Sequence, residues 1–298
     1  MCVACVDMCV ARVQGDSCCW VCTWCEAWQR VLDATHCVDC PEGWWPSTDR
    51  SECFRLTQQY VRWWSVYALA PATLALIGIL LTLLVLVVFL RNVHTPVVKA
   101  SGRELSFLLL SGFLVCFAMT FVLLTKPSVW SCAAARVGIG LGFAITYGAL
   151  LTKTNRIARI FESATRSARA PAFVSPKSQL VITALLVGVQ LASTCVWLVL
   201  EPPGVRLYYP THVRSEIVLK CRADDMSLLY SLTYNMLLVA VCTLYAVKTR
   251  TIPENFNESK FIGFAMYTTC IIWLAFVPIY FSTLNSFQVN RVPDRHSF

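Results

Sequence analysis

Six long stretches that are almost free of acidic and basic residues dominate this sequence of 298 residues. Five of them contain no Asp, Glu, Lys or Arg, and these cover residues 64–90, 105–125, 180–200, 226–247 and 261–279. Each is close to or longer than the roughly 20 apolar residues that a helix needs to cross a hydrocarbon core about 30 Å thick. Length alone therefore predicts that each forms a membrane-spanning helix.

The sixth stretch, residues 130–151, contains one charged residue, Arg136, near its beginning. A long side chain at this depth can extend to the lipid headgroups while its stem stays in the hydrocarbon, so we expect Arg136 to snorkel. The composition agrees with a membrane protein, because 57% of the residues are hydrophobic and only 14% are charged. A soluble protein would need six unusually long buried helices, which disfavours that alternative.

The distribution of Lys and Arg between the loops predicts the orientation. Twelve of these residues fall in segments 91–104, 153–179 and 248–260, against five in segments 124–131 and 201–226. Positive residues are retained on the cytoplasmic side, so the amino terminus is predicted to be extracellular. With six spans, the carboxyl terminus returns to that side. The net charge of +8 then reflects topology, and no nucleic-acid partner is expected.

Cysteine is concentrated at the amino-terminal end, where ten of the sixteen cysteines precede residue 54. The predicted topology places this segment in an oxidising compartment, which favours a disulfide framework. The alternative is a zinc site, because Cys22 and Cys25, and again Cys37 and Cys40, have the two-residue spacing of zinc ligands. A segment of about 50 residues buries too little apolar surface to be stable on a core alone, so crosslinks are expected.

Several short strings resemble one receptor family, in the order in which that family has them. They are residues 18–25 (CCWVCTWC), 37–40 (CVDC), 43–46 (GWWP), 95–105 (TPVVKASGREL), 151–160 (LTKTNRIARI), 253–258 (PENFNE) and 266–276 (MYTTCIIWLAF). Together they resemble the metabotropic glutamate receptors, which are class C G-protein-coupled receptors. Residues 126–128, 200–204 and 248–264 are most similar to the subgroup that couples to inhibitory G proteins.

The resemblance implies an all-α polytopic membrane protein with six transmembrane helices of a class C seven-helix bundle, preceded by a small disulfide-rich extracellular segment. The implied domains are a partial cysteine-rich domain (1–56), a linker (57–63), a transmembrane domain (64–285) and an unrelated short tail (286–298). The implied spans cover about 64–90, 102–125, 130–152, 179–200, 226–248 and 261–284. We expect no seventh helix and no bilobed glutamate-binding domain, so glutamate would act only through a domain absent here.

The resemblance also implies disulfide pairs. The implied pairs are Cys132 with Cys221, Cys25 with Cys37, Cys40 with Cys53, Cys5 with Cys19 and Cys9 with Cys22. Cys18 corresponds to the cysteine that bridges to the bilobed domain, and Cys2 has no counterpart that we can identify.

Four residues near the cytoplasmic side correspond to family positions that take part in signalling. Lys153 and Glu258 match an ion pair between the third and sixth spans, whose loss would favour an open state of the bundle. The alternative is a pair of solvated charges that contributes under about 1 kcal/mol. Arg156 and Arg159, three residues apart on one helix, would face a G protein or anionic lipid.

Four residues within the spans match positions that line the family's allosteric modulator cavity: Tyr147, Asn235, Trp273 and Phe276. Polar atoms at lipid depth need partners inside the protein, so Asn235 and the Tyr147 hydroxyl should face the interior. Ordinary helix packing is the alternative interpretation of these positions.

The resemblance therefore implies a metabotropic glutamate receptor fragment in the plasma membrane that signals to a heterotrimeric G protein, of the inhibitory class. No enzymatic activity and no cofactor are expected, because His36, His94, His212 and His296 lie on separate loops. Expected partners are the bilayer and a second receptor chain, as a homodimer or with the full-length receptor. One alternative is a nonsignalling truncated isoform that dampens the full-length receptor. Another, a six-span channel subunit, lacks a helix with regularly spaced basic residues and a pore loop.

Overall fold

The structure is a computed structural model, which describes residues 9–13, 20–33, 36–41, 43–56, 58–60, 63–166, 173–208, 217–222, 227–248 and 257–289. The chain divides into two compact units. The first comprises Met1–Tyr60 and Val205–Cys221, and the second comprises Val61–Gly204 and Arg222–Phe298. Each unit is described by itself below.

The first unit consists of short strands. Its strands are β1 (Cys9–Val13), β2 (Trp20–Trp24), β3 (Gln29–Asp33), β4 (His36–Asp39), β5 (Trp44–Pro46), β6 (Cys53–Arg55), β7 (Gln58–Gln59), β8 (Val205–Tyr208) and β9 (Ile217–Cys221). Three antiparallel pairs, β1–β2, β3–β4 and β5–β6, follow one another along the chain. The fourth sheet has the order β7–β9–β8, in which β9 pairs parallel to β7 and antiparallel to β8.

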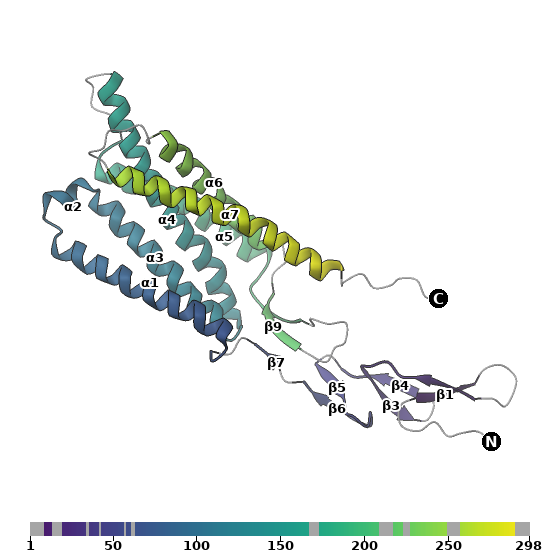
Figure 1. Ribbon diagram of the computed structural model, residues 1–298. Helices are drawn as coiled ribbons and strands as arrows, with labels where there is room; N and C mark the ends of the chain where they lie inside the picture. Colours follow the sequence, from purple (N-terminus) through teal and green to yellow (C-terminus); the bar gives the residue numbers. More distant parts are fainter. Residues whose placement is uncertain are drawn as a thin grey trace. The chain divides into compact units, whose positions relative to one another are not determined.

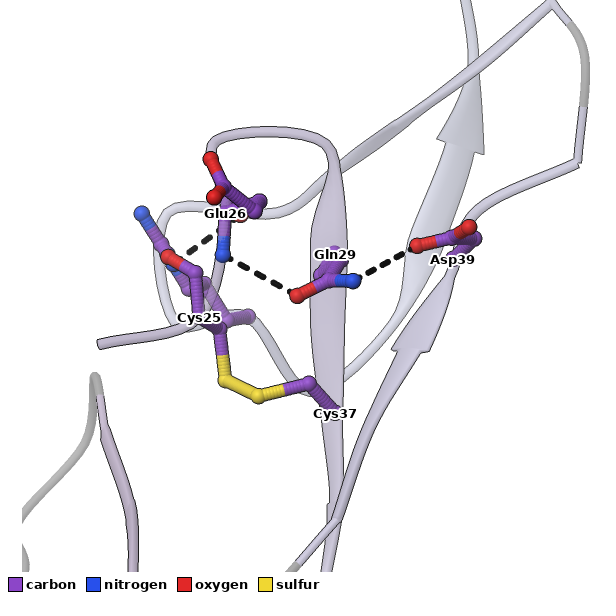
Figure 2. Close-up of a disulfide and its surroundings, with 6 residues drawn as sticks. Cys25, Glu26, Gln29, Cys37 and Asp39 are labelled. Carbon is purple, nitrogen blue, oxygen red and sulfur yellow. Dashed lines mark hydrogen bonds between the residues drawn. A yellow bond between two sulfur atoms is a disulfide. The ribbon is translucent and has the colours of Figure 1, made fainter. Parts of the chain in front are cut away.

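Among the described residues of this unit, one disulfide joins Cys25 to Cys37 and another joins Cys40 to Cys53. These are the pairs that the family resemblance implies. Figure 2 shows how Gln29 supports the first of them: its side-chain oxygen accepts a hydrogen bond from the Glu26 N–H (3.0 Å), and its side-chain nitrogen donates to Asp39 (2.8 Å). The crosslinks compensate for the small apolar core that a segment of this size can form.

The second unit is helical. Its helices are α1 (Val66–Arg91), α2 (Pro96–Ala100), α3 (Arg103–Leu124), α4 (Val129–Arg166), α5 (Pro176–Leu200), α6 (Ser227–Lys248) and α7 (Asn257–Val289). Within the described residues, six of these helices, all except α2, are long and apolar enough to cross a membrane. The prediction of six spans is thus confirmed by length and composition. Two helices are longer than predicted, because α4 continues beyond residue 152 and α7 continues beyond residue 285.

Local sequence explains where the helices begin. Ser175 precedes α5 in an extended conformation, and its hydroxyl accepts a hydrogen bond from the Ser178 N–H (3.3 Å). Pro176 occupies the first turn, where its missing N–H leaves no helical hydrogen bond unmade. Gly102 precedes α3 with a φ of +78°, a left-handed conformation that glycine adopts without a steric cost.

Helix α4 is the central helix of the membrane unit. It packs against α3, α5, α6 and α7, and α1 packs against α3 (Figure 1). About half of the α4 span (56%) is buried inside the protein, whereas the other five spans are 11–39% buried. The other helices therefore face lipid over much of their surface, while α4 presents most of its residues to neighbouring helices.

Glycine allows α3 and α4 to approach closely. A β-carbon at Gly112 of α3 would lie 2.6 Å from the Thr146 hydroxyl oxygen and 3.0 Å from the Thr146 backbone nitrogen. A β-carbon at Gly142 of α4 would lie 2.8 Å from the Cys116 sulfur. Small residues at such positions let helix backbones come together in a membrane, where dispersion contacts replace the hydrophobic effect as the main attraction.

The close approach at Gly112 gives a first prediction. A Gly112→Val substitution forces side-chain atoms against the α4 backbone, which should destabilise the bundle by about 1–3 kcal/mol and lower the melting temperature by about 5 °C. The measurement is thermal unfolding of the purified chain in detergent. Gly188→Val on α5 is the matched control, because a β-carbon at Gly188 meets nothing within 4 Å. Equal melting temperatures for the two variants would contradict the packing described.

Candidate functional site

A buried polar layer lies between α4, α5 and α6. Asn235 of α6 has no exposed surface, and its side-chain nitrogen lies 3.4 Å from both the Gly140 carbonyl oxygen of α4 and the Gln190 side-chain oxygen of α5. The Gln190 side-chain nitrogen donates to the Thr194 hydroxyl (3.3 Å) and to the Ser231 carbonyl oxygen (3.4 Å). This layer connects three helices through side chains that cannot be hydrated by bulk water.

Gly140 makes room for this layer, because a β-carbon there would lie 2.5 Å from the Gln190 side-chain nitrogen. The hydrogen bonding is nevertheless incomplete within the described residues. The Asn235 side-chain oxygen is buried and has no hydrogen-bond partner. Such an unpaired acceptor costs free energy, and it can accept a hydrogen bond from a donor that enters the bundle.

An aromatic row adjoins the polar layer along α4. Phe143 stacks on Tyr147 with a ring distance of 5.9 Å and meets Trp273 of α7 edge-on at 6.0 Å. Trp273 in turn meets Phe276 edge-on at 5.6 Å. The structure thus brings three of the four predicted modulator-cavity residues, Tyr147, Trp273 and Phe276, into one row. It places the fourth, Asn235, in the polar layer instead.

The buried core continues from this row toward the beginning of α7. It consists of Tyr147, Leu238, Val239, Cys242, Ile262 and Met266. Met266 and Cys242 are almost completely buried, so α7 packs tightly against α4 and α6 in this region. The tight packing fits the alternative interpretation of the aromatic positions, in which they hold helices together.

The structure corrects the expectation for Arg136. Its side chain does not extend to lipid headgroups but is buried, with 6% of its surface exposed. The guanidinium donates hydrogen bonds to the backbone carbonyls of Glu201 and Arg222, and it lies 3.7 Å from the Glu201 carboxylate. The Trp197 ring covers it at 4.6 Å. Two backbone carbonyls and the carboxylate of Glu201, the residue that follows α5, therefore take the place of the lipid headgroups as partners of Arg136.

The other end of α4 carries the predicted switch residues. The Lys153 ammonium lies 3.5 Å from the Ser106 hydroxyl oxygen of α3. Arg156 lies beside the turn before α3, since a β-carbon at Gly102 would be 3.2 Å from its guanidinium. Glu258 belongs to the first turn of α7, but its side chain lies outside the described residues. The structure therefore places Lys153 and Arg156 against α3 and its preceding turn.

Arg159 has different neighbours from Arg156. Its side chain donates to Asn155 one turn earlier (3.2 Å) and lies 6.0 Å from the Phe173 ring, which is 63% exposed. Further along, Lys248 at the end of α6 forms an ion pair with Glu162 of α4 (3.1 Å). The two arginines therefore share a helix but turn toward different segments, one toward α3 and one toward the residues before α5.

The cysteines separate into bonded and free groups. Cys132 and Cys221 are each disulfide-bonded, as are Cys25, Cys37, Cys40 and Cys53. Because three of the four cysteines in the zinc-like spacing are oxidised, they cannot be thiolate ligands, which overturns the zinc alternative. Cys116, Cys195, Cys242 and Cys270 are free thiols within the spans. Cys5 and Cys19 lie outside the described residues, as do the side chains of Cys9 and Cys22.

Gln190 belongs to this site, although no sequence motif indicated it. The available signal was its polarity, because a glutamine in the middle of an otherwise apolar span rarely faces lipid. The glycines at every second position of residues 138–142 were a second signal, because they permit close helix contacts on two sides of α4.

The fold and the sequence together define the class of protein. The family described as "7 transmembrane sweet-taste receptor of 3 GCPR" matches residues 61–292, which include the six apolar helices of the described residues. The match also extends beyond residue 285, the predicted end of the membrane domain. The chain therefore belongs to the class C, or family 3, G-protein-coupled receptors.

Within this class, the chain is similar to metabotropic glutamate receptors. The metabotropic glutamate receptor of Drosophila melanogaster is 56% identical over 94% of this chain and 29% of the relative. The probable metabotropic glutamate receptor mgl-1 of Caenorhabditis elegans is 52% identical over 93% of this chain and 28% of its own length. Metabotropic glutamate receptor 4 of Rattus norvegicus is 48% identical over 92% of this chain and 31% of its own length. The chain thus spans less than a third of the length of each of these curated relatives.

The polar layer gives a second prediction. Replacing Gln190 with Leu removes one of the two partners of the Asn235 side-chain nitrogen, and leaving one of its buried N–H groups unpaired should cost about 1–3 kcal/mol of stability. Adding Asn235→Leu should restore part of the loss, because both polar partners are then replaced by apolar groups. Thermal unfolding of the wild type, the two single variants and the double variant gives a double-mutant cycle, in which the losses of stability are compared. Strictly additive losses would show that the two side chains do not interact.

Proposed function

We propose that this chain is the transmitting part of a metabotropic glutamate receptor, which carries a signal across the membrane to a heterotrimeric G protein. The observation that supports this most directly is the arrangement of the family-matched residues. They form one packed helical unit. A single helix of this unit, α4, contains Arg136, part of the polar layer, part of the aromatic row and Lys153. A continuous interior of this kind can change state as a whole.

The proposed location is the plasma membrane, with the amino terminus outside the cell. The excess of Lys and Arg in the segments between α1 and α3, α4 and α5, and α6 and α7 supports this orientation. The disulfides of the first unit agree, because structural disulfides persist in extracellular compartments. In this orientation Lys153 lies near the cytoplasm and Arg136 lies near the outer surface.

Coupling to the inhibitory class of G protein rests on residues 126–128, 200–204 and 248–264, which are most similar to that subgroup. The proposed second partner is another receptor chain, in a homodimer or with a full-length receptor. Arg156 and Arg159 would contribute to the surface that meets the G protein. These assignments follow from the resemblance of the sequence strings.

We also propose two residue pairs from the same resemblance. Cys132 would pair with Cys221, which is supported by the bonded state of both and by the position of Cys132 one turn before Arg136. Arg136 holds the carbonyl of Arg222, the residue that follows Cys221. Lys153 would pair with Glu258 across the α4–α7 interface. The modulator site would include Tyr147, Trp273 and Phe276, with the unpaired Asn235 oxygen as an acceptor.

The experiment that tests the proposal is nucleotide exchange on a purified G protein of the inhibitory class, mixed with the chain in lipid nanodiscs. The expected result is faster exchange than with empty nanodiscs, and no such increase with a G protein of another class. If exchange is unchanged, coexpression with a full-length receptor separates the alternatives. A lowered glutamate response would then favour the dampening isoform, and an unchanged response would reject both.

Lys153 gives a third prediction. A Lys153→Ala substitution removes the ammonium that links α4 to its neighbours, so the open state should gain population and basal nucleotide exchange should rise about two- to fivefold. Lys177→Ala is the matched control, because Lys177 is an exposed lysine in the first turn of α5. Exchange that stays at the wild-type level, or falls, would contradict a restraining role for Lys153.

A further inference from the structure

We propose that, in the absence of a bound G protein, Phe173 and Arg159 hold an anionic phospholipid of the cytoplasmic leaflet. Phe173 lies just before α5, and Arg159 lies on α4. The proposal goes beyond the signalling function and takes from it only the assignment of this end of α4 to the cytoplasm. It starts from an unusual feature of the backbone, namely an exposed aromatic residue in a left-handed conformation.

The conformation of Phe173 indicates that its ring serves a purpose other than folding. Its φ is +63°, a region in which a bulky residue is strained and glycine is not. With 63% of its surface exposed, the residue gains little from packing in return. Glycine would therefore suit the fold better at this position, and a strained residue that contributes little to packing points to a function.

The turn that contains Phe173 is held by a buried side chain. The side-chain nitrogen of Gln179 donates a hydrogen bond to the Phe173 carbonyl oxygen, and only 2% of the surface of Gln179 is exposed. Within the described residues, the side-chain oxygen of Gln179 is buried and has no hydrogen-bond partner, which costs stability. The turn is thus fixed before any ligand arrives, so little conformational entropy is lost when the ring takes part in binding.

Arg159 adds a positive charge beside the ring. Its guanidinium lies 6.0 Å from the centre of the Phe173 ring, and its side chain donates to the Asn155 side-chain oxygen (3.2 Å). Glu162, on the same helix, forms an ion pair with Lys248 (3.1 Å), which partly compensates its negative charge. The site therefore combines an apolar ring with a guanidinium, a group that binds phosphate through several N–H donors at once.

The depth of the two residues favours a lipid over a soluble partner. Ile160, next to Arg159, ends the apolar span of α4, and Pro176, shortly after Phe173, begins the apolar span of α5. Both side chains are exposed, so they face away from the helix bundle at the level of the headgroups. Aromatic rings and basic residues are both favoured at this level, and a basic residue there attracts anionic headgroups.

The test compares the binding of two lipids to the purified chain in detergent. Native mass spectrometry follows titrations with phosphatidylserine and with phosphatidylcholine of the same acyl chains. The wild type should bind its first phosphatidylserine about fivefold more tightly than its first phosphatidylcholine, as one basic residue near the headgroup predicts. Arg159→Gln should lower this preference below about twofold. Phe173→Gly should weaken the binding of both lipids, because the ring contacts the apolar part that they share.

Arg91→Gln is the matched control, because Arg91 is an exposed arginine in the last turn of α1, on the same predicted side of the membrane. It should retain the preference for phosphatidylserine. Phe173→Gly should leave the melting temperature within about 2 °C of the wild-type value, because relief of strain offsets the greater freedom of glycine in the unfolded chain. A ring that served only the fold would lower the melting temperature and leave lipid binding unchanged.

Two results would overturn the proposal. The first is an equal loss of preference in Arg91→Gln and Arg159→Gln, which a general effect of surface charge would produce. The second is an unchanged preference in Arg159→Gln; if this variant also slowed nucleotide exchange, Arg159 would belong to the surface that meets the G protein alone. Because no G protein is present in the lipid titrations, their failure is distinguishable from a failure of the proposed signalling function.

Discussion

The structure of the membrane unit depends on one constraint, which is that polar groups at lipid depth must find partners inside the protein. Most hydroxyl groups meet this constraint within their own helix, as Thr146 and Thr152 do by donating to the carbonyl four residues earlier. Three side chains that are too long or too charged for this solution, Gln190, Asn235 and Arg136, lie on α4 or against it. These polar contacts therefore contribute to the central position of α4.

The sequence predicted the six spans because length and the absence of charge are sufficient evidence in a bilayer, where few structures can cross. It did not predict the surroundings of Arg136. A periodic or compositional pattern shows only that Arg136 lies near the end of a span. Its hydrogen-bond acceptors are the backbone carbonyls of Glu201 and Arg222, which are far away in the sequence. The snorkelling expectation failed for this reason, since it considered only the helix that carries the arginine.

The cysteine-rich segment shows a similar limit. The family resemblance implied the pairs Cys25–Cys37 and Cys40–Cys53, and the structure contains both disulfides. No local pattern indicated that Gln58–Gln59 would pair with β9, because a two-residue strand has no detectable periodicity and its partner lies beyond four membrane helices. Predicting such a pairing requires the loop between α5 and α6 to be placed first, and Arg136 is the residue that holds its ends.

Helix α4 connects these regions of the membrane unit. From Arg136 to Lys153 it runs 17 residues, or about 25 Å at the rise of an α-helix, with the polar layer and the aromatic row between them. Its contact with α3 involves the helix backbone beside Gly112, whereas its contact with α7 consists of large side chains such as Phe143 and Trp273. Side-chain contacts can repack by changing rotamers, but backbone contacts at this distance cannot. A change of state that reaches α4 from its Arg136 end should therefore move α3 and α4 together and repack the interface with α7.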